Sequence, residues 1–394
     1  MIERSHLKLF EERIIGTRTS IQLVSGPRQA GKTTMVGQLI EKTDTPYLFV
    51  SADNVAGQEH FWLTNQWETA RQLCKKAGNF VLAVDEVQKL PNWREEVKLL
   101  WDEDTRSKIP LKVILIDSSR LLMLPTVYES TDDLFEHTYI GHWSYAEMKR
   151  AFDWSPERFV WFGAYPGTAA LTNDEERWKS YVRDAIIETS ISRDILMLTR
   201  VDKPALMRRM FELGCINTGK ELSYTKILGQ LQDSGNTVTL SHYLQLLDNV
   251  GLLAGLEKFT EGRSGQRATS PKFQVHNNAL LSAQQDLTFD QCRNNPAIWA
   301  SWVKSAIGAH LLDYSLTKKV KLYYWRSGKY EIDYVVRKGH QIFGVEVKTG
   351  LETKTSGMEF FKKTHPEARL ILVGKSGIPW ETFLEMNPGD IFDW

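Results

Sequence analysis

A loop bounded by glycines near the start of the chain constrains the fold more than any other segment. Residues 26–33 read Gly-Pro-Arg-Gln-Ala-Gly-Lys-Thr, directly after a short apolar run at residues 21–24 and directly before a helical pattern. The two glycines let the backbone curl so that successive N–H groups point to one centre, where the N-terminus of the new helix adds partial positive charge. Strand, loop and helix in this order form the Walker A pattern, which binds nucleotide phosphates at the edge of an α/β sheet.

Each kind of side chain in this loop has an expected role. We predict that Lys32 reaches the β- and γ-phosphate oxygens and that the Thr33 hydroxyl binds Mg²⁺, so the expected cofactors are ATP and Mg²⁺. A chance match in a glycine-rich turn is the alternative, and the flanking strand and helix argue against it. The predicted ATP-binding residues are Gly26, Pro27, Arg28, Gln29, Ala30, Gly31, Lys32, Thr33 and Thr34.

A second, acidic element agrees with the first. Residues 80–86 read Phe-Val-Leu-Ala-Val-Asp-Glu, a continuous apolar run like that of a strand buried in a parallel sheet. We predict that Asp85 holds Mg²⁺, directly or through water, and that Glu86 polarises the attacking water as the general base. Strands also end in acids at a solvent edge, but the Walker A loop upstream favours the Walker B interpretation. With Lys32, these residues predict ATP hydrolysis.

Strand candidates alternate with amphipathic helical stretches along the first part of the chain, as in a doubly wound α/β sheet. They lie at residues 21–24, 47–50, 81–84, 113–116 and, less clearly marked, 137–140. Ser118 follows the fourth strand, and a polar side chain there, between the two Walker strands, would contact the γ-phosphate. We predict Ser118 as a catalytic sensor of that phosphate. The alternative is a polar loop that caps the strand.

Composition sets the outer bounds. With 394 residues the chain is expected to hold two or three domains. Lysine plus arginine and aspartate plus glutamate both number 49, so any nucleic-acid surface must be local.

The three separated cysteines argue for a reducing compartment and against a zinc site or disulfide framework. No apolar run approaches the roughly 18 residues of a membrane span, and the charged start is unlike a secretory signal, which predicts a cytoplasmic protein without membrane contact.

Several of these segments carry a resemblance to a known family. GPRQAGKTT, the apolar strand ending in Asp-Glu, and VILIDSSRLL are similar to a large prokaryotic family of AAA+ ATPases with a C-terminal domain of unknown function. GAYPGT, SYVRDAIIETSISRDI, YYWRSGKYEIDYVV and GVEVKTG extend the likeness along most of the chain. The resemblance implies an α/β fold: a P-loop AAA+ core with a five-stranded parallel sheet, a helical lid, a winged-helix-like module and an α/β restriction-endonuclease-like end. The corresponding domains are 1–145, 146–275 and 276–394.

The chain departs from the family pattern at two places. Members commonly read Thr-Gly-Ser-Ser where this chain has Ile-Asp-Ser-Ser at residues 116–119, and they often have Gly-Arg where this chain has Gly141 and His142. An arginine finger cannot therefore be placed at residue 142. Arg120 and Arg193 are candidate substitutes, with solvated or salt-bridged surface arginines as the alternative.

The middle of the chain predicts a helix-turn-helix followed by a wing strand at residues 252–259. The second helix is expected to start at Thr239 or Ser241 and to expose Ser241, His242 and Gln245. It contains no arginine or lysine, the residues that supply most phosphate and guanine contacts, so packing between domains is an open alternative to DNA reading. The basic Gly-Arg-Ser-Gly-Gln-Arg at 262–267 is a candidate phosphate contact at the wing tip.

The C-terminal segment predicts strands at 321–326, 330–337, 341–348 and 369–373 and a helix at 354–363. Asp333 on the second strand, with Glu346 and Lys348 on the third, fits the PD-(D/E)xK arrangement, in which two carboxylates hold magnesium and the lysine stabilises charge on the phosphate. Many relatives have a glutamate on the preceding helix where this chain has Lys304. We therefore expect a nuclease-like fold that binds DNA or a partner without cutting, with Lys304 in an ion pair with Asp333 or Glu346. The alternative is that Glu-x-Lys is only a common triplet of a strand with two different faces.

Three functions remain open at this point. The first is an AAA+ ATPase that couples ATP binding and hydrolysis to nucleic-acid binding or remodelling, with branched or recombining DNA as a candidate partner and a ring-shaped homo-oligomer, such as a hexamer, as its form. The second is a signalling or defence ATPase that binds a protein partner through its C-terminal modules. The third, more weakly supported, is an ATP-regulated, metal-dependent nuclease.

Overall fold

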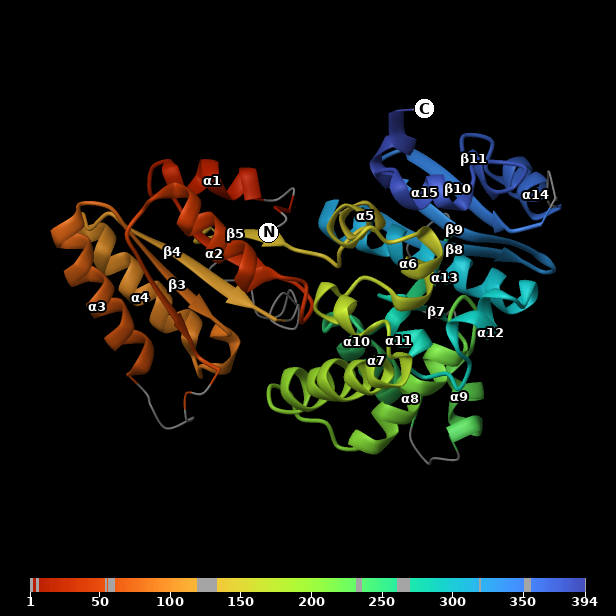
Figure 1. Ribbon diagram of the computed structural model, residues 1–394, viewed down its shortest axis with the longest axis horizontal. Helices are drawn as coiled ribbons and strands as arrows, with labels where there is room; N and C mark the ends of the chain where they lie inside the picture. Colours follow the sequence, from red (N-terminus) through yellow and green to blue (C-terminus); the bar gives the residue numbers. More distant parts are fainter. Residues whose placement is uncertain are drawn as a thin grey trace. The chain divides into compact units, whose positions relative to one another are not determined.

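The computed structural model of the chain describes residues 3–4, 7–53, 55, 61–118, 133–231, 236–260, 270–318, 320–350 and 356–393 (Figure 1). The chain forms two compact units, Met1–Ile140 and Gly141–Trp394. The predicted boundary after residue 145 lies close to this division. The predicted boundary after residue 275 falls inside the second unit, so the three-domain division stays a prediction.

The first unit is built on a five-stranded parallel sheet with strand order β2-β3-β4-β1-β5. The strands are β1 (Ile21–Ser25), β2 (Tyr47–Ser51), β3 (Phe80–Asp85), β4 (Leu111–Asp117) and β5 (Phe135–Tyr139). Each lies where the sequence predicts a strand, with ends that differ by one or two residues. β4 lies between β3 and β1, as the prediction for Ser118 requires.

Helices cover both faces of this sheet (Figure 1). Alternating strand residues divide between the two faces. Val24 and Ile114 pack with α1 (Leu7–Ile15) and α2 (Lys32–Thr43), whereas Leu23 and Leu115 pack with the opposite layer. That layer holds α3 (Trp62–Ala77) and α4 (Trp93–Arg106), and a short 3₁₀ turn, η1 (Val87–Lys89), follows β3. Burial on two faces explains why the strands read as continuous apolar runs.

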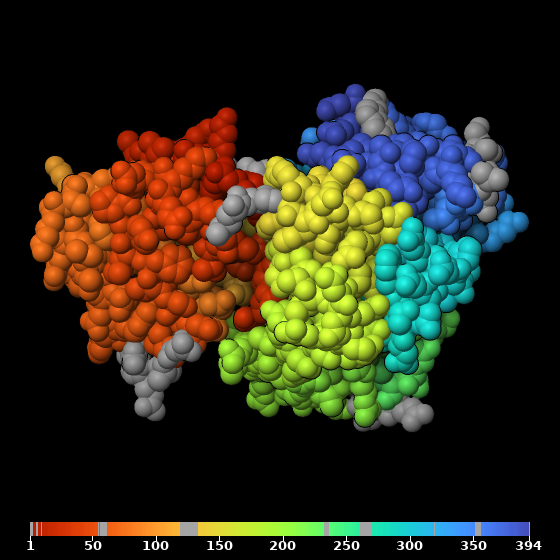
Figure 2. Space-filling view, viewed as in Figure 1, coloured from red at the N-terminus to blue at the C-terminus, as the bar shows by residue number. Residues whose placement is uncertain are grey.

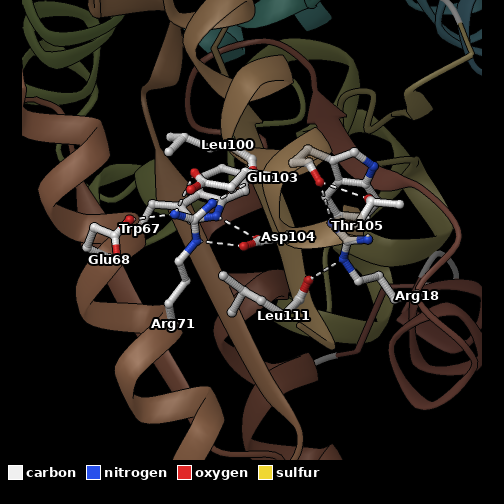
Figure 3. Close-up of polar contacts among 10 residues, drawn as sticks. Arg18, Trp67, Glu68, Arg71, Leu100, Glu103, Asp104, Thr105 and Leu111 are labelled. Atoms are coloured by element: carbon white, nitrogen blue, oxygen red, sulfur yellow. Dashed lines mark hydrogen bonds and ion pairs between the residues drawn. The ribbon is translucent and has the colours of Figure 1, made fainter. Parts of the chain in front are cut away.

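A buried ion pair joins α3 to α4 (Figure 3). Asp104 is fully buried and accepts from Arg71 Nε at 2.6 Å and from Trp67 Nε1 at 2.8 Å. Burial raises the pKa of Asp104, and the hydrogen bonds from Trp67 and Arg71 oppose that rise. Arg71 also donates to the Leu100 carbonyl at 2.8 Å. Arg18 donates to the Leu111 carbonyl at 2.9 Å, which ties the segment before β1 to the start of β4.

The second unit contains a six-stranded mixed sheet with strand order β11-β10-β9-β8-β6-β7. Its strands are β6 (Leu253–Lys258), β7 (Lys272–Val275), β8 (Lys321–Ser327), β9 (Tyr330–Lys338), β10 (Gln341–Lys348) and β11 (Arg369–Gly374). The predicted wing strand is β6, and it pairs with β8 in parallel and with β7 in antiparallel orientation. The predicted wing strand and the C-terminal strands therefore share one sheet.

The helices of the second unit begin with α5 (Tyr145–Phe152), α6 (Pro156–Phe162), α7 (Glu175–Tyr181), α8 (Pro204–Ile216), α9 (Tyr224–Leu231) and α10 (Thr237–Asn249). They continue with α11 (Asn278–Ser282), α12 (Phe289–Arg293), α13 (Pro296–Lys318), α14 (Ser356–Thr364) and α15 (Trp380–Glu385). Shorter turns are η4 (Pro166–Leu171), η7 (Pro388–Asp393) and two π-helical turns, η5 (Val182–Glu188) and η6 (Ser190–Ile195). Distant segments meet here: Lys149 of α5 pairs with Glu385 of α15 at 2.6 Å, and Figure 2 shows the yellow segment against the blue one.

Helices α9 and α10 occupy the predicted helix-turn-helix, and Ser241, His242 and Gln245 are exposed on α10. The predicted start of the second helix at Thr239 or Ser241 is wrong. The side chain of Asn236 accepts a hydrogen bond from the Thr239 N–H at 2.7 Å and caps a helix that begins at residue 237. The predicted basic wing tip at 262–267 lies outside the described residues.

From α13 onward the chain runs helix, three antiparallel strands, helix and a parallel strand. The structure places α13, β8, β9, β10, α14 and β11 where the sequence predicts them, with strand ends that agree within one residue. Within the described residues, no helix is both long enough and apolar enough to cross a membrane.

Candidate nucleotide site

The Walker A loop leaves β1 and enters α2 through two special glycines. A Cβ on Gly26 would lie 2.0 Å from the Ile140 carbonyl oxygen, so only glycine fits beside that backbone. Gly31 has φ 85°, a left-handed conformation that glycine adopts without strain, and it is the N-cap of α2. Between them Gln29 also has a positive φ, of 60°. The loop therefore curls as the sequence pattern predicts.

Lys32 is buried and lies across this loop. Its ammonium group donates to the carbonyl oxygens of Gly26 at 3.0 Å and Pro27 at 2.9 Å. These contacts place a positive charge at the centre of the curled backbone, at the N-terminus of α2, where that terminus adds to the attraction for an anion. Arg4, which the sequence analysis did not identify, donates to the Ala30 carbonyl at 3.1 Å and so ties the N-terminal segment to the loop.

The two predicted magnesium ligands touch each other. Thr33 Oγ1 donates to Asp85 Oδ2 at 2.8 Å, so the first turn of α2 meets the carboxyl end of β3. Burial raises the pKa of Asp85, and the charge of Glu86 adds to that rise, whereas the hydrogen bond from Thr33 lowers it. Hydroxyl and carboxylate oxygens are ligands that suit Mg²⁺, which usually takes one or two protein oxygens together with phosphate oxygens.

Glu86 is held at both carboxylate oxygens. Ser118 Oγ donates to Oε1, and Gln88 Nε2 donates to Oε2 at 2.7 Å. Lys89 Nζ lies 3.6 Å from Oε2. The backbone of Glu86 is left-handed, with φ 57°, which turns its side chain back toward the serine that follows β4. Protein side chains therefore fix the orientation of this carboxylate.

The predicted residues lie together at the carboxyl ends of neighbouring strands β1, β4 and β3. Thr33 and Thr34 are exposed, and Arg28 is half-buried. Sequence reasoning missed Arg4, Gln88 and Lys89. Gln88 becomes a partner of Glu86 only because of the left-handed turn at Glu86, for which the sequence pattern gives no signal.

Both candidate arginine fingers remain predictions. Arg120 lies outside the described residues, and Arg193 is an exposed residue of the second unit. Gly141 and His142 have a different role. The His142 N–H donates to Asp313 Oδ1 at 2.7 Å, and a Cβ on Gly141 would lie 2.0 Å from that same oxygen. The glycine is thus required by its close approach to α13.

The C-terminal residues form a separate cluster in the second unit. Lys304 Nζ lies 2.8 Å from Asp333 Oδ1, the ion pair that the sequence analysis predicts, and Lys348 Nζ lies 3.4 Å from Glu346 Oε1. The sequence analysis missed Lys272, whose ammonium lies 3.4 Å from the same oxygen of Asp333. Lys272 comes from β7, far away in the chain, so only the strand order reveals it.

Charge and burial act in opposite directions on these two acids. Burial alone would raise the pKa of Asp333, but Lys272 and Lys304 outweigh it and lower the pKa to about 2. Burial, with the neighbouring charge of Asp333, raises the pKa of Glu346 to about 7. Within the described residues, no group of three His, Cys, Asp or Glu side chains is arranged to hold a metal ion.

Three stretches of the chain match known protein families. Residues 18–149 match an AAA domain, residues 154–291 match a domain of unknown function, DUF8612, and residues 302–381 match another, DUF4143. The chain therefore joins an AAA domain to a C-terminal domain of unknown function, and the family resemblance is confirmed on this point.

Similar proteins include the uncharacterised proteins Mb2031c of Mycobacterium bovis and Rv2008c of Mycobacterium tuberculosis. Each is 25% identical over 345 residues, which cover 84% of this chain and 70% of the relative. Among solved structures, the Thermotoga maritima RuvB Holliday junction branch migration motor is 17% identical and covers 64% of this chain and 90% of its own. A second T. maritima RuvB structure is 18% identical and covers 63% and 85%. Both have a TM-score of 0.33, too low to support an inference about this chain.

Proposed function

We propose that this chain, an AAA domain followed by a DUF4143 domain, is an ATPase that binds ATP with Mg²⁺, hydrolyses it and couples the reaction to binding or remodelling nucleic acid. The observation that carries the proposal is the junction of α2 with the end of β3. There Thr33 and Asp85 lie 2.8 Å apart and Glu86 is the next residue. Two oxygen ligands and a base meet beside the loop that would hold the phosphates.

The proposed division of labour follows from position. Lys32 exchanges its loop carbonyl acceptors for the β- and γ-phosphate oxygens, and the loop N–H groups bind the β-phosphate. Mg²⁺, when bound, would be held by Thr33 and Asp85 and would offset the negative charge of the phosphates. Glu86 accepts a proton from the attacking water at its carboxylate, and Ser118 orients that carboxylate through its hydroxyl.

The nucleic-acid part of the proposal rests on the modules of the second unit. Helices α9 and α10, which occupy the predicted helix-turn-helix, precede strands β6 and β7, an order that winged DNA-binding modules use. The exposed residues of α10 are not basic, so phosphate contacts would have to come from elsewhere in this unit. A ring-shaped homo-oligomer is part of the same proposal.

One experiment separates the candidate functions. ATP turnover in Mg²⁺ is measured alone and with single-stranded, duplex and four-way-junction DNA at two salt concentrations. We expect DNA to stimulate turnover, and more so at low salt, because phosphate contacts release counterions. No turnover under any condition would refute the ATPase itself. Turnover indifferent to DNA but raised by a protein would favour the signalling function instead.

The same samples test the nuclease alternative. We expect no DNA cutting in Mg²⁺ or Mn²⁺, because Lys304 and Lys272 already neutralise Asp333. Cleavage that is lost in both Asp333→Ala and Lys348→Ala would establish the nuclease and overturn this expectation.

A further inference from the structure

A cleft of about 470 Å³ opens in the second unit, between the loop after α8, the first half of α13 and the end of β10. Its walls carry more positive than negative side chains. The basic side chains that line it are Lys220, Lys272, Lys304, Arg326 and Lys348. The acidic ones are Glu221 and Glu331. Since Glu221 lies 3.6 Å from Arg326, part of the acidic charge is already compensated at the rim.

Two carboxylates, Asp333 and Glu346, lie next to the lysines that line this cleft and do not line it themselves. Asp333 Oδ1 faces Lys304 and Lys272, and Asp333 Oδ2 accepts the Val347 N–H at 3.0 Å. Glu346 Oε2 accepts the Asp333 N–H at 3.2 Å, and its Oε1 faces Lys348. Each of these four oxygens thus already has an ammonium group or an N–H as a neighbour, and a divalent cation there would be repelled by the charge of the lysines. The lysines, and not these two carboxylates, therefore face the cleft.

The ammonium groups keep donors for a ligand. An ammonium has three N–H donors. Among the described residues, Lys304 Nζ donates to one acceptor, Asp333 Oδ1, and Lys348 Nζ has one acidic neighbour, Glu346. The side chains of Lys304 and Lys348 are 26% and 31% exposed, and both line the cleft. The neighbouring acids raise the pKa of Lys304 against the effect of burial, which keeps its ammonium charged.

We propose that this cleft binds the phosphodiester backbone of nucleic acid without a metal ion, through the ammonium groups of Lys304, Lys348 and Lys220. The ligand is an anion because the donors that face the cleft are cationic and the carboxylates behind them are already paired. These cations come from three separate elements, the loop after α8, α13 and the end of β10, which suits a ligand that carries several phosphates in succession. The inference rests on the proposed function, since it supplies the phosphate contacts that α10 lacks.

The test is a binding titration of the full-length protein without ATP. A short fluorescein-labelled DNA, single-stranded or duplex, is titrated in EDTA and again in Mg²⁺, at several salt concentrations, by fluorescence anisotropy. We expect binding in EDTA to be at least as tight as in Mg²⁺, because the site needs no metal ion and Mg²⁺ competes for the phosphates. Lys304→Ala, Lys348→Ala and Lys220→Ala should each weaken binding by roughly 3- to 10-fold and lower the slope of log affinity against log salt by about 1.

Controls keep the result interpretable. Lys304→Ala leaves Asp333 with less compensation and can destabilise the fold, so Lys220→Ala, an exposed rim residue, decides the case if Lys304→Ala unfolds. Lys363→Ala removes an exposed lysine of α14 that does not line the cleft, and it should leave binding unchanged. Unchanged affinity and salt slope in Lys220→Ala and Lys348→Ala would overturn the proposal. Binding that requires Mg²⁺ would also overturn it.

A competition arm identifies the ligand. Inorganic phosphate and a mononucleotide are added to the DNA complex at constant ionic strength, and weak competition by both is expected. Tight, saturable phosphate binding that depends on Lys304, together with DNA binding that does not, would refute nucleic acid as the ligand. Because these titrations contain no ATP, a protein that fails to hydrolyse ATP would refute the proposed function and leave this result intact.

Discussion

Lys32 holds its ammonium against two carbonyl oxygens of its own loop, 3.0 Å and 2.9 Å away. A phosphate can take over these donors without any movement of the backbone, because the loop is already curled. We expect Lys32→Ala to reduce ATP affinity at least about 100-fold, since the variant loses the charge that opposes the β- and γ-phosphates. Isothermal titration with an ATP analogue measures the loss. Lys42→Ala, an exposed lysine of the same helix, serves as the control, and equal affinity of Lys32→Ala and wild type would refute the site.

A change at Glu86 separates ATP binding from ATP hydrolysis. Glu86→Gln keeps the size and polarity of the side chain and can still meet Ser118 and Gln88, but it cannot take a proton from water. We expect ATP affinity within about 3-fold of wild type and turnover reduced about 100-fold or more. Single-turnover hydrolysis and nucleotide binding are measured side by side. Turnover close to that of wild type would exclude Glu86 as the base.

Glu346 makes stability depend on pH in a defined direction. Burial and Asp333 raise its folded-state pKa to about 7 from 4.5, so the folded protein holds this proton more tightly than the unfolded chain. Lys348 and Lys304 face the carboxyl and partly oppose the shift. The stabilising contribution is complete below pH 4.5 and is lost as the pH rises through 7. Asp333 has the opposite behaviour, and its contribution is lost only as the pH falls from 3.8 toward 2.

Glu346→Gln removes this titration. Relative to wild type, the variant should gain about 1–3 kcal/mol in free energy of unfolding on going from below pH 4.5 to above pH 7. Urea unfolding at the two pH values measures the difference. Glu359→Gln, an exposed glutamate of α14, is the matched control and should show no such change. A pH-independent difference between Glu346→Gln and wild type would contradict the assignment.

At the scale of helices and strands, the ion pair between Arg71 and Asp104 fixes α3 to α4. The Arg71 side chain is 5% exposed and that of Asp104 is not exposed at all, so removing the arginine leaves a buried, uncompensated carboxylate. Arg71→Met should cost about 3–5 kcal/mol of unfolding free energy, the usual effect of breaking a buried pair. Chemical denaturation measures it, with the exposed Arg106→Met as control. A loss below about 1 kcal/mol would show that Asp104 finds other partners or becomes protonated.

Helices and strands could be predicted from the sequence wherever burial requires a regular pattern of apolar residues. The strands of both sheets could be predicted because buried strands need continuous or alternating apolar residues, and the Walker loop because its glycines are sterically required. The start of α10 could not, because several polar residues around 236–241 can cap a helix and only the backbone selects Asn236.

Site residues that lie far away in the sequence could not be predicted either. Arg4 behind the Walker loop and Lys272 beside Asp333 are placed by tertiary packing alone, and no local spacing marks either residue. The pair of Lys304 and Asp333 could be predicted because the family pattern has an acid at the position of Lys304.

At the scale of the whole molecule, the second unit is expected to fold as one piece. The predicted domain 276–394 would lack β6 and β7, which extend the sheet beyond β8, and would also lack Lys272. We expect a fragment of residues 141–394 to unfold cooperatively and a fragment of residues 276–394 to be unstable or aggregated, because β8 would become an exposed edge. Circular dichroism melts of the two fragments test this. A cooperative transition of the shorter fragment at the temperature of the longer one would restore the boundary after residue 275.

The shared sheet limits how this chain can exchange parts during evolution. A gene fusion that replaced the C-terminal domain would most simply join the chain at the predicted boundary after residue 275. Lys272 lies before this boundary, but it forms an ion pair with Asp333, which lies after it. A recombination point between residues 272 and 333 would combine Asp333 with a β7 strand that has no lysine at this place. The reciprocal product would keep Lys272 buried without Asp333. Either product carries an unbalanced interior charge. Strands β6 and β7 and the C-terminal strands should therefore be inherited together.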